Sequence, residues 1–297
     1  YKGSEYSNVA KGTTTLDEHL SHMLVLKGDL TRNTQKGYET AFKSIKRFCE
    51  EKGYNVKMDI NKVNLQFVDE YRIWLVSEAK YAGDTALKYF VGLGTALKKA
   101  KQYGKLYHNP FDEGVEYPKS SDEEMVYLTP NEVTRMMQIE CRLHLVKDAF
   151  MFMIFTGIRS QDCKSLKWKN LPIIDSVVNI QVKTQKRKTD IFFPIPPQAN
   201  NYLPKRMGDD DLVFPNYKTE SYHNEALREW ALKSDVKKHI VPHSARHSFS
   251  AYMLSKGTPL YTLSKLLGHT NARTTEDRYG HLSKEDTDKA VRKAFRF

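Results

Sequence analysis

Apolar residues recur every three or four positions through the first third of the chain, and this spacing predicts a bundle of helices. Thr15 and Glu18 have the spacing of a capping box that opens the first helix, which we expect to end near Lys27. Gly53 is expected to end the second helix, because glycine favours the position just past a helix end. The side chains expected to face the core are Leu16, Leu20, Met23 and Leu24 in the first helix, Tyr38, Phe42, Ile45 and Cys49 in the second, Val68, Tyr71 and Leu75 in the third, and Leu87, Val91 and Leu97 in the fourth.

A change of composition after this bundle predicts a domain boundary. Asn109 and Pro110 end the fourth helix, because proline cannot continue one. The segment 112–127 is polar, contains glycine and proline and has no helical or strand period, so it is predicted to be a linker. Thr129, Pro130 and Glu132 then supply an N-cap, a proline in the first turn and an acidic capping partner. We therefore expect a helical domain over residues 1–111 and a second domain over residues 128–297.

The second domain is predicted to combine helices with one hairpin. A nearly continuous apolar helix ends at Gly157. Val178, Ile180 and Val182 then alternate with polar residues, and the segment 191–195 returns as a second strand. The expected fold is mostly α with a small antiparallel β-sheet.

The charge balance points to a polyanionic partner. Among 297 residues, 47 Lys and Arg against 36 Asp and Glu give a net charge of +11, which makes DNA or RNA the first candidate. The alternative is a soluble protein that is basic for other reasons. The longest apolar run, 149–155, is far shorter than the ~20 residues of a membrane-spanning helix. The three widely spaced cysteines favour neither a disulfide framework nor a zinc site, so we expect a reducing, cytoplasmic location.

A first candidate for chemistry follows the apolar helix. Gly157 ends that helix, Ser160 is expected to cap the next, and Arg159 lies in the connection, where it can face a ligand. Asp162 either orients Arg159 by an ion pair or is an acidic residue that the first turn of a helix favours. Read alone, the segment indicates only a surface arginine beside a helix cap.

The predicted hairpin turn is the most basic stretch of the domain. It contains four cations, Lys183, Lys186, Arg187 and Lys188. One interpretation is a solvated turn whose lysines discourage edge pairing of the strands. The other is a flexible ammonium that enters a DNA groove and donates a proton to a leaving oxygen.

A third candidate is the segment HSARH after Pro242. His243 and Arg246 are three residues apart at a helix start, where backbone N–H groups and the helix dipole attract phosphate. A lone histidine there is more often a packing residue. The helix that follows is expected to bury Phe249, Tyr252 and Met253 and to end at Gly257.

The last candidates surround two short helices near the C-terminus. Leu263, Leu266 and Leu267 predict a buried helix that Gly268 ends, and His269 lies just past it. A Thr-Thr pair at 274–275 is then expected to cap a helix that contains Tyr279. A tyrosine at such a position is usually a buried packing residue. Only its combination with the other candidate segments suggests that it is a nucleophile.

Together, five segments resemble the signature of the tyrosine recombinase (integrase) family. They are TGIRSQD, the lysine-rich hairpin, HSARH, LLGH and a tyrosine after a Thr-Thr pair, in the family's order. The resemblance extends over roughly residues 30–297 and implies a helical core-binding domain followed by an α+β catalytic domain. It implies that the catalytic residues are Arg159, Lys186, His243, Arg246, His269 and Tyr279.

The resemblance leaves the hairpin lysine open. Counting back from Pro194 favours Lys186, and Lys183 and Lys188 are the alternatives.

The position of the tyrosine departs from the family pattern. Most members have the tyrosine nine residues after the LLGH histidine, whereas Tyr279 is ten after His269 and Arg278 stands at the usual place. We interpret this as a loop insertion of one residue. His281 and Tyr261 are poorer nucleophiles because neither has the Thr-Thr context.

The activity that the resemblance implies is site-specific DNA recombination. Two arginines would bind the nonbridging oxygens of a phosphodiester, and Tyr279 would form a covalent 3′-phosphotyrosine. The hairpin lysine would protonate the leaving 5′-hydroxyl, while His243 and His269 position the phosphate and assist proton movement. No metal, cofactor or ATP is implied. The alternatives are a type IB topoisomerase and a DNA-binding regulator that has lost catalysis.

The resemblance also implies the partners. They are double-stranded DNA, four copies of the chain around a Holliday junction, and accessory proteins that bend DNA. The segment 283–297 has an apolar stripe and is expected to dock on a neighbouring copy or, alternatively, on its own domain. The cations expected to contact DNA, rather than to lie on solvated helix faces, are Lys98, Lys99, Lys101, Lys164, Lys167, Lys169, Lys183, Arg187 and Lys188.

The N-terminal helices resemble most those of integrases from Bacteroides-type mobile elements. Such integrases usually carry an arm-binding domain upstream of the core-binding helices. Because the sequence begins at Tyr1, we expect it to be part of a longer protein and to lack that domain.

Overall fold

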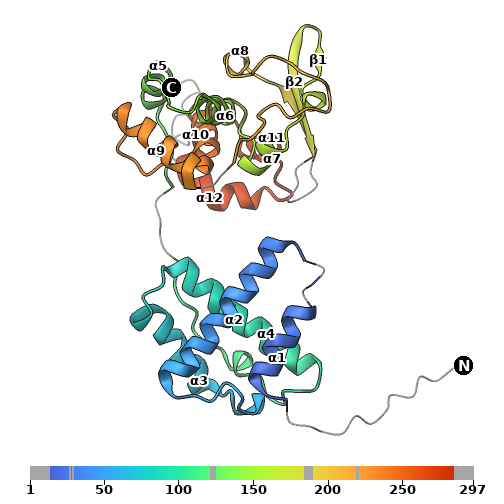
Figure 1. Cartoon of the computed structure of the whole chain (residues 1–297), viewed down its shortest axis with the longest axis vertical. Helices are drawn as coiled ribbons and strands as arrows, with labels where there is room; N and C mark the ends of the chain where they lie inside the picture. The colour runs from blue at the N-terminus through green and yellow to red at the C-terminus, as the bar shows by residue number, and fades with distance from the viewer. Residues whose placement is uncertain are drawn as a thin grey trace, which may run out of the picture. The chain divides into compact units, whose positions relative to one another are not determined.

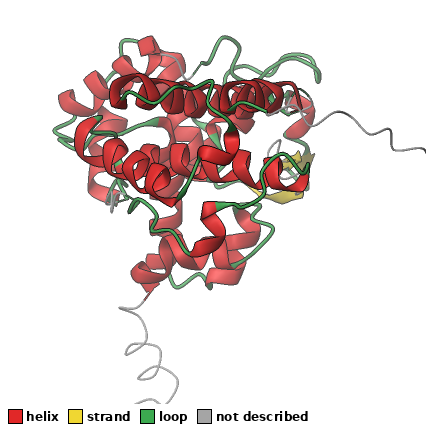
Figure 2. Cartoon of the chain, turned by 90° about the horizontal axis from the view of Figure 1, so that it is seen from below, coloured by secondary structure: helices red, strands yellow, loops and turns green. Residues whose placement is uncertain are grey.

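The computed structural model describes residues 14–26, 28, 30–120, 125–183, 190–218 and 221–283, without the side chains of 281–283. The chain divides into two compact units, 1–123 and 124–297. Helices dominate both units, and the strands that the structure describes form one small sheet in the second unit (Figures 1 and 2). The predicted fold class, mostly α with a small antiparallel sheet, is therefore confirmed.

The first unit is a helical bundle. Its elements are α1 (Leu16–Leu26), α2 (Arg32–Lys52), the short turn η1 (Ile60–Lys62), α3 (Leu65–Ile73), the π-turn η2 (Trp74–Glu78), α4 (Gly83–Gln102) and the turn η3 (Pro110–Glu113). The capping box is confirmed, because the Thr15 N–H donates to Glu18 over 2.9 Å and the Glu18 N–H donates to the Thr15 hydroxyl over 3.2 Å. Gly53 ends α2 with a left-handed φ of 74°, as predicted.

The buried face of α4 differs from the predicted one. Val91 is 44% exposed, and Leu87 is only half-buried. Leu97 is buried as predicted, and the other residues that face the core are Ala86, Phe90, Gly92, Leu93, Ala96 and Ala100. The reason is the close approach of α2, because a Cβ on Gly92 would lie 2.8 Å from the Cβ of Ala41. Small residues face α2 at this crossing, and the bulkier Val91 lies outside it.

Part of the predicted linker packs on the first unit. Phe111 and Tyr117 contact the Phe90 ring, with centroid distances of 5.2 and 5.3 Å. Asn109 begins η3 by accepting the Phe111 N–H over 3.2 Å. The chain therefore packs on the bundle until about residue 118, because two aromatic side chains of the polar stretch contact Phe90 on α4.

The second unit combines helices with the small sheet, which lies at its edge (Figure 1). Its elements are α5 (Pro130–Gln138), α6 (His144–Thr156), α7 (Ser160–Lys164), η4 (Trp168–Asn170), β1 (Ile173–Ile174), β2 (Val177–Lys183), β3 (Asp190–Pro194), α8 (Pro197–Asn200), α9 (Ser221–Lys233), α10 (Pro242–Ser255), α11 (Leu260–Leu266) and α12 (Arg273–Ser283). The predicted start at Thr129 and the predicted end at Gly157 are both confirmed, by a capping box with Glu132 and by a left-handed φ of 66°.

The sheet has the antiparallel order β1-β2-β3. The predicted hairpin is confirmed by the register, which pairs Ile180 with Phe193 and Val182 with Ile191. Strand β1 was not predicted, because two residues are too few to show a period of two.

Two apolar clusters hold the second unit together. The larger one is centred on α6, whose residues 149–154 are all buried, and α10 packs against this helix. The smaller cluster joins α10, α11 and α12 through Phe249, Leu254, Leu263, Leu267 and Tyr279. Tyr252 does not share this face: it is 49% exposed, which corrects the predicted apolar face of α10.

Candidate active site

Four of the six predicted catalytic residues come together from different parts of the second unit. Arg159 precedes α7, Arg246 lies in the second turn of α10, His269 lies between α11 and α12, and Tyr279 lies in α12. In the folded chain the charges of Arg159 and Arg246 both act on the pKa of Tyr279. Residues separated by up to 120 positions in sequence therefore share one electrostatic environment.

Arg246 is the most buried charge of this cluster. Its side chain donates to the Gly157 carbonyl over 2.8 Å, to the Leu267 carbonyl over 2.6 Å and to His269 Nε2 over 3.0 Å. These contacts use three of the five N–H donors of a guanidinium and fix its plane. Burial, followed by the charge of Arg159, lowers the pKa of Arg246 to about 9. The group is still protonated at neutral pH.

Arg159 has a different support. It occupies the N-cap position of α7 with extended backbone, and its Nη1 lies 3.8 Å from Oδ2 of buried Asp162 in the first turn. This contact holds the guanidinium next to α7. Ser160, which was expected to be the N-cap, is instead the first residue of the helix, because the chain stays extended until Arg159 after the left-handed Gly157.

His269 lies against Arg246. Its Nε2 accepts from that guanidinium, which has no acceptor atoms, so Nδ1 carries the ring hydrogen. Nδ1 donates to the Thr275 hydroxyl over 2.7 Å. This hydroxyl was expected to cap α12. Instead the helix begins at Arg273, whose N–H donates to Asn271, and Thr275 orients the histidine.

Tyr279 is 1% exposed in the small cluster of α10, α11 and α12. Burial raises its pKa, while a hydrogen bond with Ser250 and the charges of Arg246, Arg278 and Arg159 lower it. The extra residue before it does not keep this tyrosine away from the arginines.

Tyr261, the alternative tyrosine, is 65% exposed on α11. The side chain of His281 lies outside the described residues.

His247 was missed by the sequence analysis. Its Nδ1 lies 2.9 Å from the Tyr279 hydroxyl oxygen, and its ring meets that of His243 edge to face at 4.7 Å. Burial, then the charges of His243, Arg278 and Arg246, lower its pKa to about 3, so the ring is neutral at neutral pH. The available signal was the spacing: His247 is one helical turn after His243 and therefore shares its face.

The neutral state of His247 predicts an acid sensitivity. Because the folded pKa of about 3 lies below the unfolded value of about 6.5, the unfolded chain binds the proton first as pH falls. The stability linked to neutral His247 is complete above pH 6.5 and is lost progressively towards pH 3. We expect wild type to lose about 2 kcal/mol more free energy of unfolding than His247→Asn between about pH 7.5 and about pH 5. Urea unfolding of both proteins measures this, and equal losses would contradict it.

The predicted DNA-contacting cations have mixed surroundings. Lys101 pairs with Asp112 over 2.6 Å, and Lys167 and Lys169 both pair with Asp210, over 3.3 and 2.6 Å. Lys98 is exposed on α4, Lys99 lies over the Tyr103 ring, and Lys164 is half-buried on α7. Lys183 is exposed at the end of β2. Lys186, Arg187 and Lys188 lie outside the described residues.

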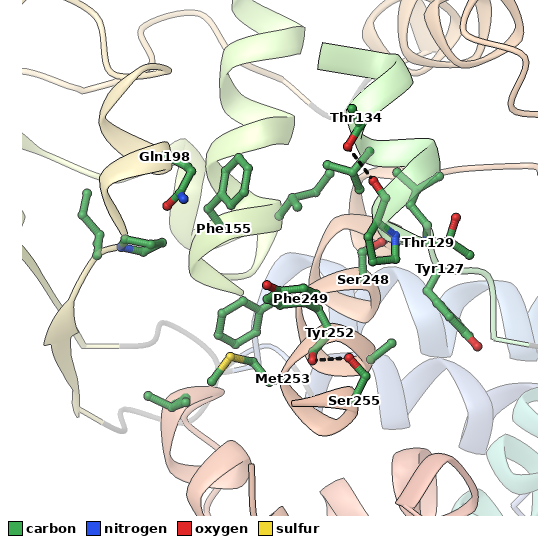
Figure 3. Close-up of a pocket in the computed structure, with 18 of the residues that line it drawn as sticks. Tyr127, Thr129, Thr134, Phe155, Gln198, Ser248, Phe249, Tyr252, Met253 and Ser255 are labelled. Carbon is green, nitrogen blue, oxygen red and sulfur yellow. Dashed lines mark hydrogen bonds between the residues drawn. The ribbon is translucent and has the colours of Figure 1, made fainter. Parts of the chain in front are cut away.

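An apolar groove lies beside the catalytic cluster. It encloses about 1000 Å³ between α5, α6, β3 and α10. Phe155, Phe249 and Met253 lie along it (Figure 3). Phe249 also packs in the small cluster that contains Tyr279, so this one side chain lines the groove and belongs to the cluster around the tyrosine.

Within the described ranges, no three His, Cys, Asp or Glu side chains are arranged to hold a metal ion. No helix among these residues is long and apolar enough to span a membrane.

Two family models match the chain. Residues 126–286 match the phage integrase family, and residues 15–118 match the phage integrase SAM-like domain. A tyrosine recombinase of Thermosipho africanus is 24% identical over 279 residues, covering 89% of this chain and 93% of that protein. Tyrosine recombinase XerD of Listeria monocytogenes is 25% identical over 289 residues, covering 91% and 94%.

Solved structures share the fold. A lambda integrase dimer bound to a core site has a TM-score of 0.72 at 17% identity, covering 89% of this chain and 95% of that one. The Tn1549 transposon integrase bound to transposon right end DNA has a TM-score of 0.71 at 17% identity, covering 96% and 100%.

Proposed function

Because the chain belongs to the phage integrase family of tyrosine recombinases, we propose that it cuts and rejoins DNA at specific sites through a covalent 3′-phosphotyrosine on Tyr279. The observation that carries this proposal is the convergence of Tyr279 with two arginines. Tyr279 is buried, and the charges of Arg246 and Arg159 act on its hydroxyl. A tyrosine kept only for packing needs no such surroundings.

Arg159 and Arg246 bind the scissile phosphate in this proposal. Guanidinium groups recognise phosphate oxygens bidentately and offset the negative charge that grows in a pentavalent transition state. The backbone carbonyls and His269 hold Arg246 in place before DNA arrives, and Asp162 does the same for Arg159. His243 and His269 position the phosphate.

Tyr279 attacks phosphorus, and the 5′-oxygen leaves. The bond energy is kept in the phosphotyrosine, so that a 5′-hydroxyl can rejoin the strand without ATP. Lys186 is the proposed acid for the leaving oxygen, with Lys183 and Lys188 as alternatives. Exchange of strands between two duplexes in this way passes through a Holliday junction.

We propose that double-stranded DNA lies against the exposed cations of both units. The net charge of +11 supports this. Lys98, Lys164 and Lys183 are proposed to contact phosphates, together with Lys99, Arg187 and Lys188. Lys101 and Lys167 must first leave their carboxylate partners, which makes their contribution smaller.

Four copies of the chain are proposed to act together, because recombination of two duplexes needs four strand cuts. The apolar groove beside Phe249 supports this, since it offers an apolar surface for the stripe predicted in residues 283–297 of a neighbouring copy. Light scattering of the protein on its isolated target site measures the number of chains. A single copy per site would favour packing of the tail on its own unit.

Three finer features belong to the same proposal. We place the protein in the cytoplasm, which its three free, buried cysteines support. We propose a Bacteroides-type mobile element as its source, on the strength of the N-terminal helices. DNA-bending accessory proteins complete the proposed assembly.

Covalent capture tests the function. Wild type and Tyr279→Phe are incubated with a randomised duplex library and denatured, and the attached DNA is sequenced. We expect wild type to enrich an inverted-repeat site and Tyr279→Phe to retain no DNA, since its ring lacks the attacking oxygen. Adducts spread over all sequences would favour the topoisomerase alternative. Equally little adduct from both proteins would favour a DNA-binding regulator.

A further inference from the structure

The Tyr279 hydroxyl contacts a histidine that the proposed mechanism does not use. His247 Nδ1 lies 2.9 Å from the hydroxyl oxygen, and the two ring centroids are 5.8 Å apart. His247 is on α10 and Tyr279 on α12, and the two helices pack against each other. Any proton that leaves Tyr279 therefore has an imidazole nitrogen within hydrogen-bond distance.

His269, a second histidine near the arginines, has both of its ring nitrogens engaged. His269 uses Nε2 for Arg246 and Nδ1 for Thr275. Its ring thus orients Arg246, whereas His247 contacts the attacking oxygen itself.

The surroundings keep His247 able to accept a proton. Burial disfavours its charged form most, and the charges of His243 and Arg246 on α10 and of Arg278 on α12 add to this effect, so the ring is neutral. A bound phosphodiester brings a negative charge next to the same arginines, which opposes their effect and makes the ring more basic. Basicity therefore rises when the substrate is in place.

We propose, building on the proposed function, that His247 is a catalytic residue that takes the phenolic proton of Tyr279 during attack on the phosphate. The bond from the tyrosine oxygen to phosphorus forms while the bond from phosphorus to the 5′-oxygen breaks. The phenolic proton moves to Nδ1, and the hairpin lysine gives a proton to the 5′-oxygen. In the rejoining step His247 returns its proton to the leaving phenolate.

The test compares His247→Asn with wild type in single-turnover cleavage of the captured site. Asparagine presents a hydrogen-bond acceptor close to the position of Nδ1 but is not basic, so it holds the hydroxyl without taking its proton. We expect cleavage to slow by about a hundredfold or more and to become faster with rising pH, as hydroxide replaces the lost base. His239→Asn, at an exposed position of the same unit, is the matched control and retains the wild-type rate.

A second substrate distinguishes the role of the proposed base, His247, from that of the proposed acid, the hairpin lysine. Sulfur in place of the bridging 5′-oxygen leaves without a proton, so we expect this substrate to restore cleavage to variants of the hairpin lysine. We expect His247→Asn to remain slow on this substrate. A wild-type rate for His247→Asn on either substrate, or an unchanged pH profile, would overturn the proposal.

A measurement without DNA gives an independent answer. In ¹⁵N spectra of histidine-labelled protein, we expect His247 Nδ1 to be unprotonated near pH 7, and a protonated Nδ1 would overturn the proposal. Wild type that forms no adduct with any DNA would instead refute the proposed function. The two failures are therefore distinct.

Discussion

Replacing Arg246 by alanine is expected to reduce single-turnover cleavage of the captured site by about a hundredfold or more. Arg246 is 2% exposed, and its charge lowers the pKa of Tyr279. Removing one donor that stabilises transition-state charge costs about 10² to 10³ in rate. The rate of adduct formation with saturating enzyme measures the loss, because saturation removes any contribution from weaker DNA binding.

The same substitution also removes structural contacts, which a matched variant can isolate. Arg246→Ala leaves the carbonyls of Gly157 and Leu267 without this donor, at a cost of about 1 to 3 kcal/mol each if no water replaces it. Arg206→Ala is the control, since Arg206 donates to the carbonyls of Leu171 and Trp168 over 3.0 and 3.3 Å, in another part of the unit. We expect Arg206→Ala to lose stability but keep its cleavage rate. Similar rates for both variants would contradict the role of Arg246.

Local signals in the sequence were sufficient to predict where most of the helices that we named begin or end. The capping boxes at Thr15 and Thr129 and the glycines at 53 and 157 work within one turn of backbone, so their residues are visible in a short window. The buried face of α4 could not be found in this way. It depends on how closely α2 approaches Gly92, and that distance is set by a partner about 50 residues away in the chain.

The candidate site shows the same contrast between residues that local motifs identify and contacts that depend on packing. Spaced motifs selected Arg159, Arg246, His269 and Tyr279, and the fold brings these residues together. The contacts among these residues could not be predicted from the sequence. HSARH indicates that His247 shares a face with His243, but the partner across from it belongs to α12, 32 residues later. The sequence could not predict the contact of His247 with Tyr279, because only the packing of α10 on α12 creates it.

Gly157→Ala is expected to destabilise the second unit by about 2 to 4 kcal/mol. Gly157 has a φ of 66°, and an alanine in this conformation costs about 1 kcal/mol. Its Cβ would also lie 2.4 Å from a carbon of the Phe249 ring, and overpacking of this kind costs about 1 to 3 kcal/mol. Urea unfolding at neutral pH measures the sum.

Gly257→Ala separates the two contributions. Gly257 is in the same unit with a φ of 78°, but a Cβ there would meet nothing within 4 Å, so only the backbone cost of about 1 kcal/mol is expected. Gly157 also places its carbonyl 2.8 Å from Arg246, and Phe249 packs beside Tyr279. We therefore expect Gly157→Ala to slow cleavage even where the protein is fully folded, while Gly257→Ala cleaves at the wild-type rate. Equal stability and equal rates for the two variants would show that Phe249 moves aside without disturbing the arginine or the tyrosine.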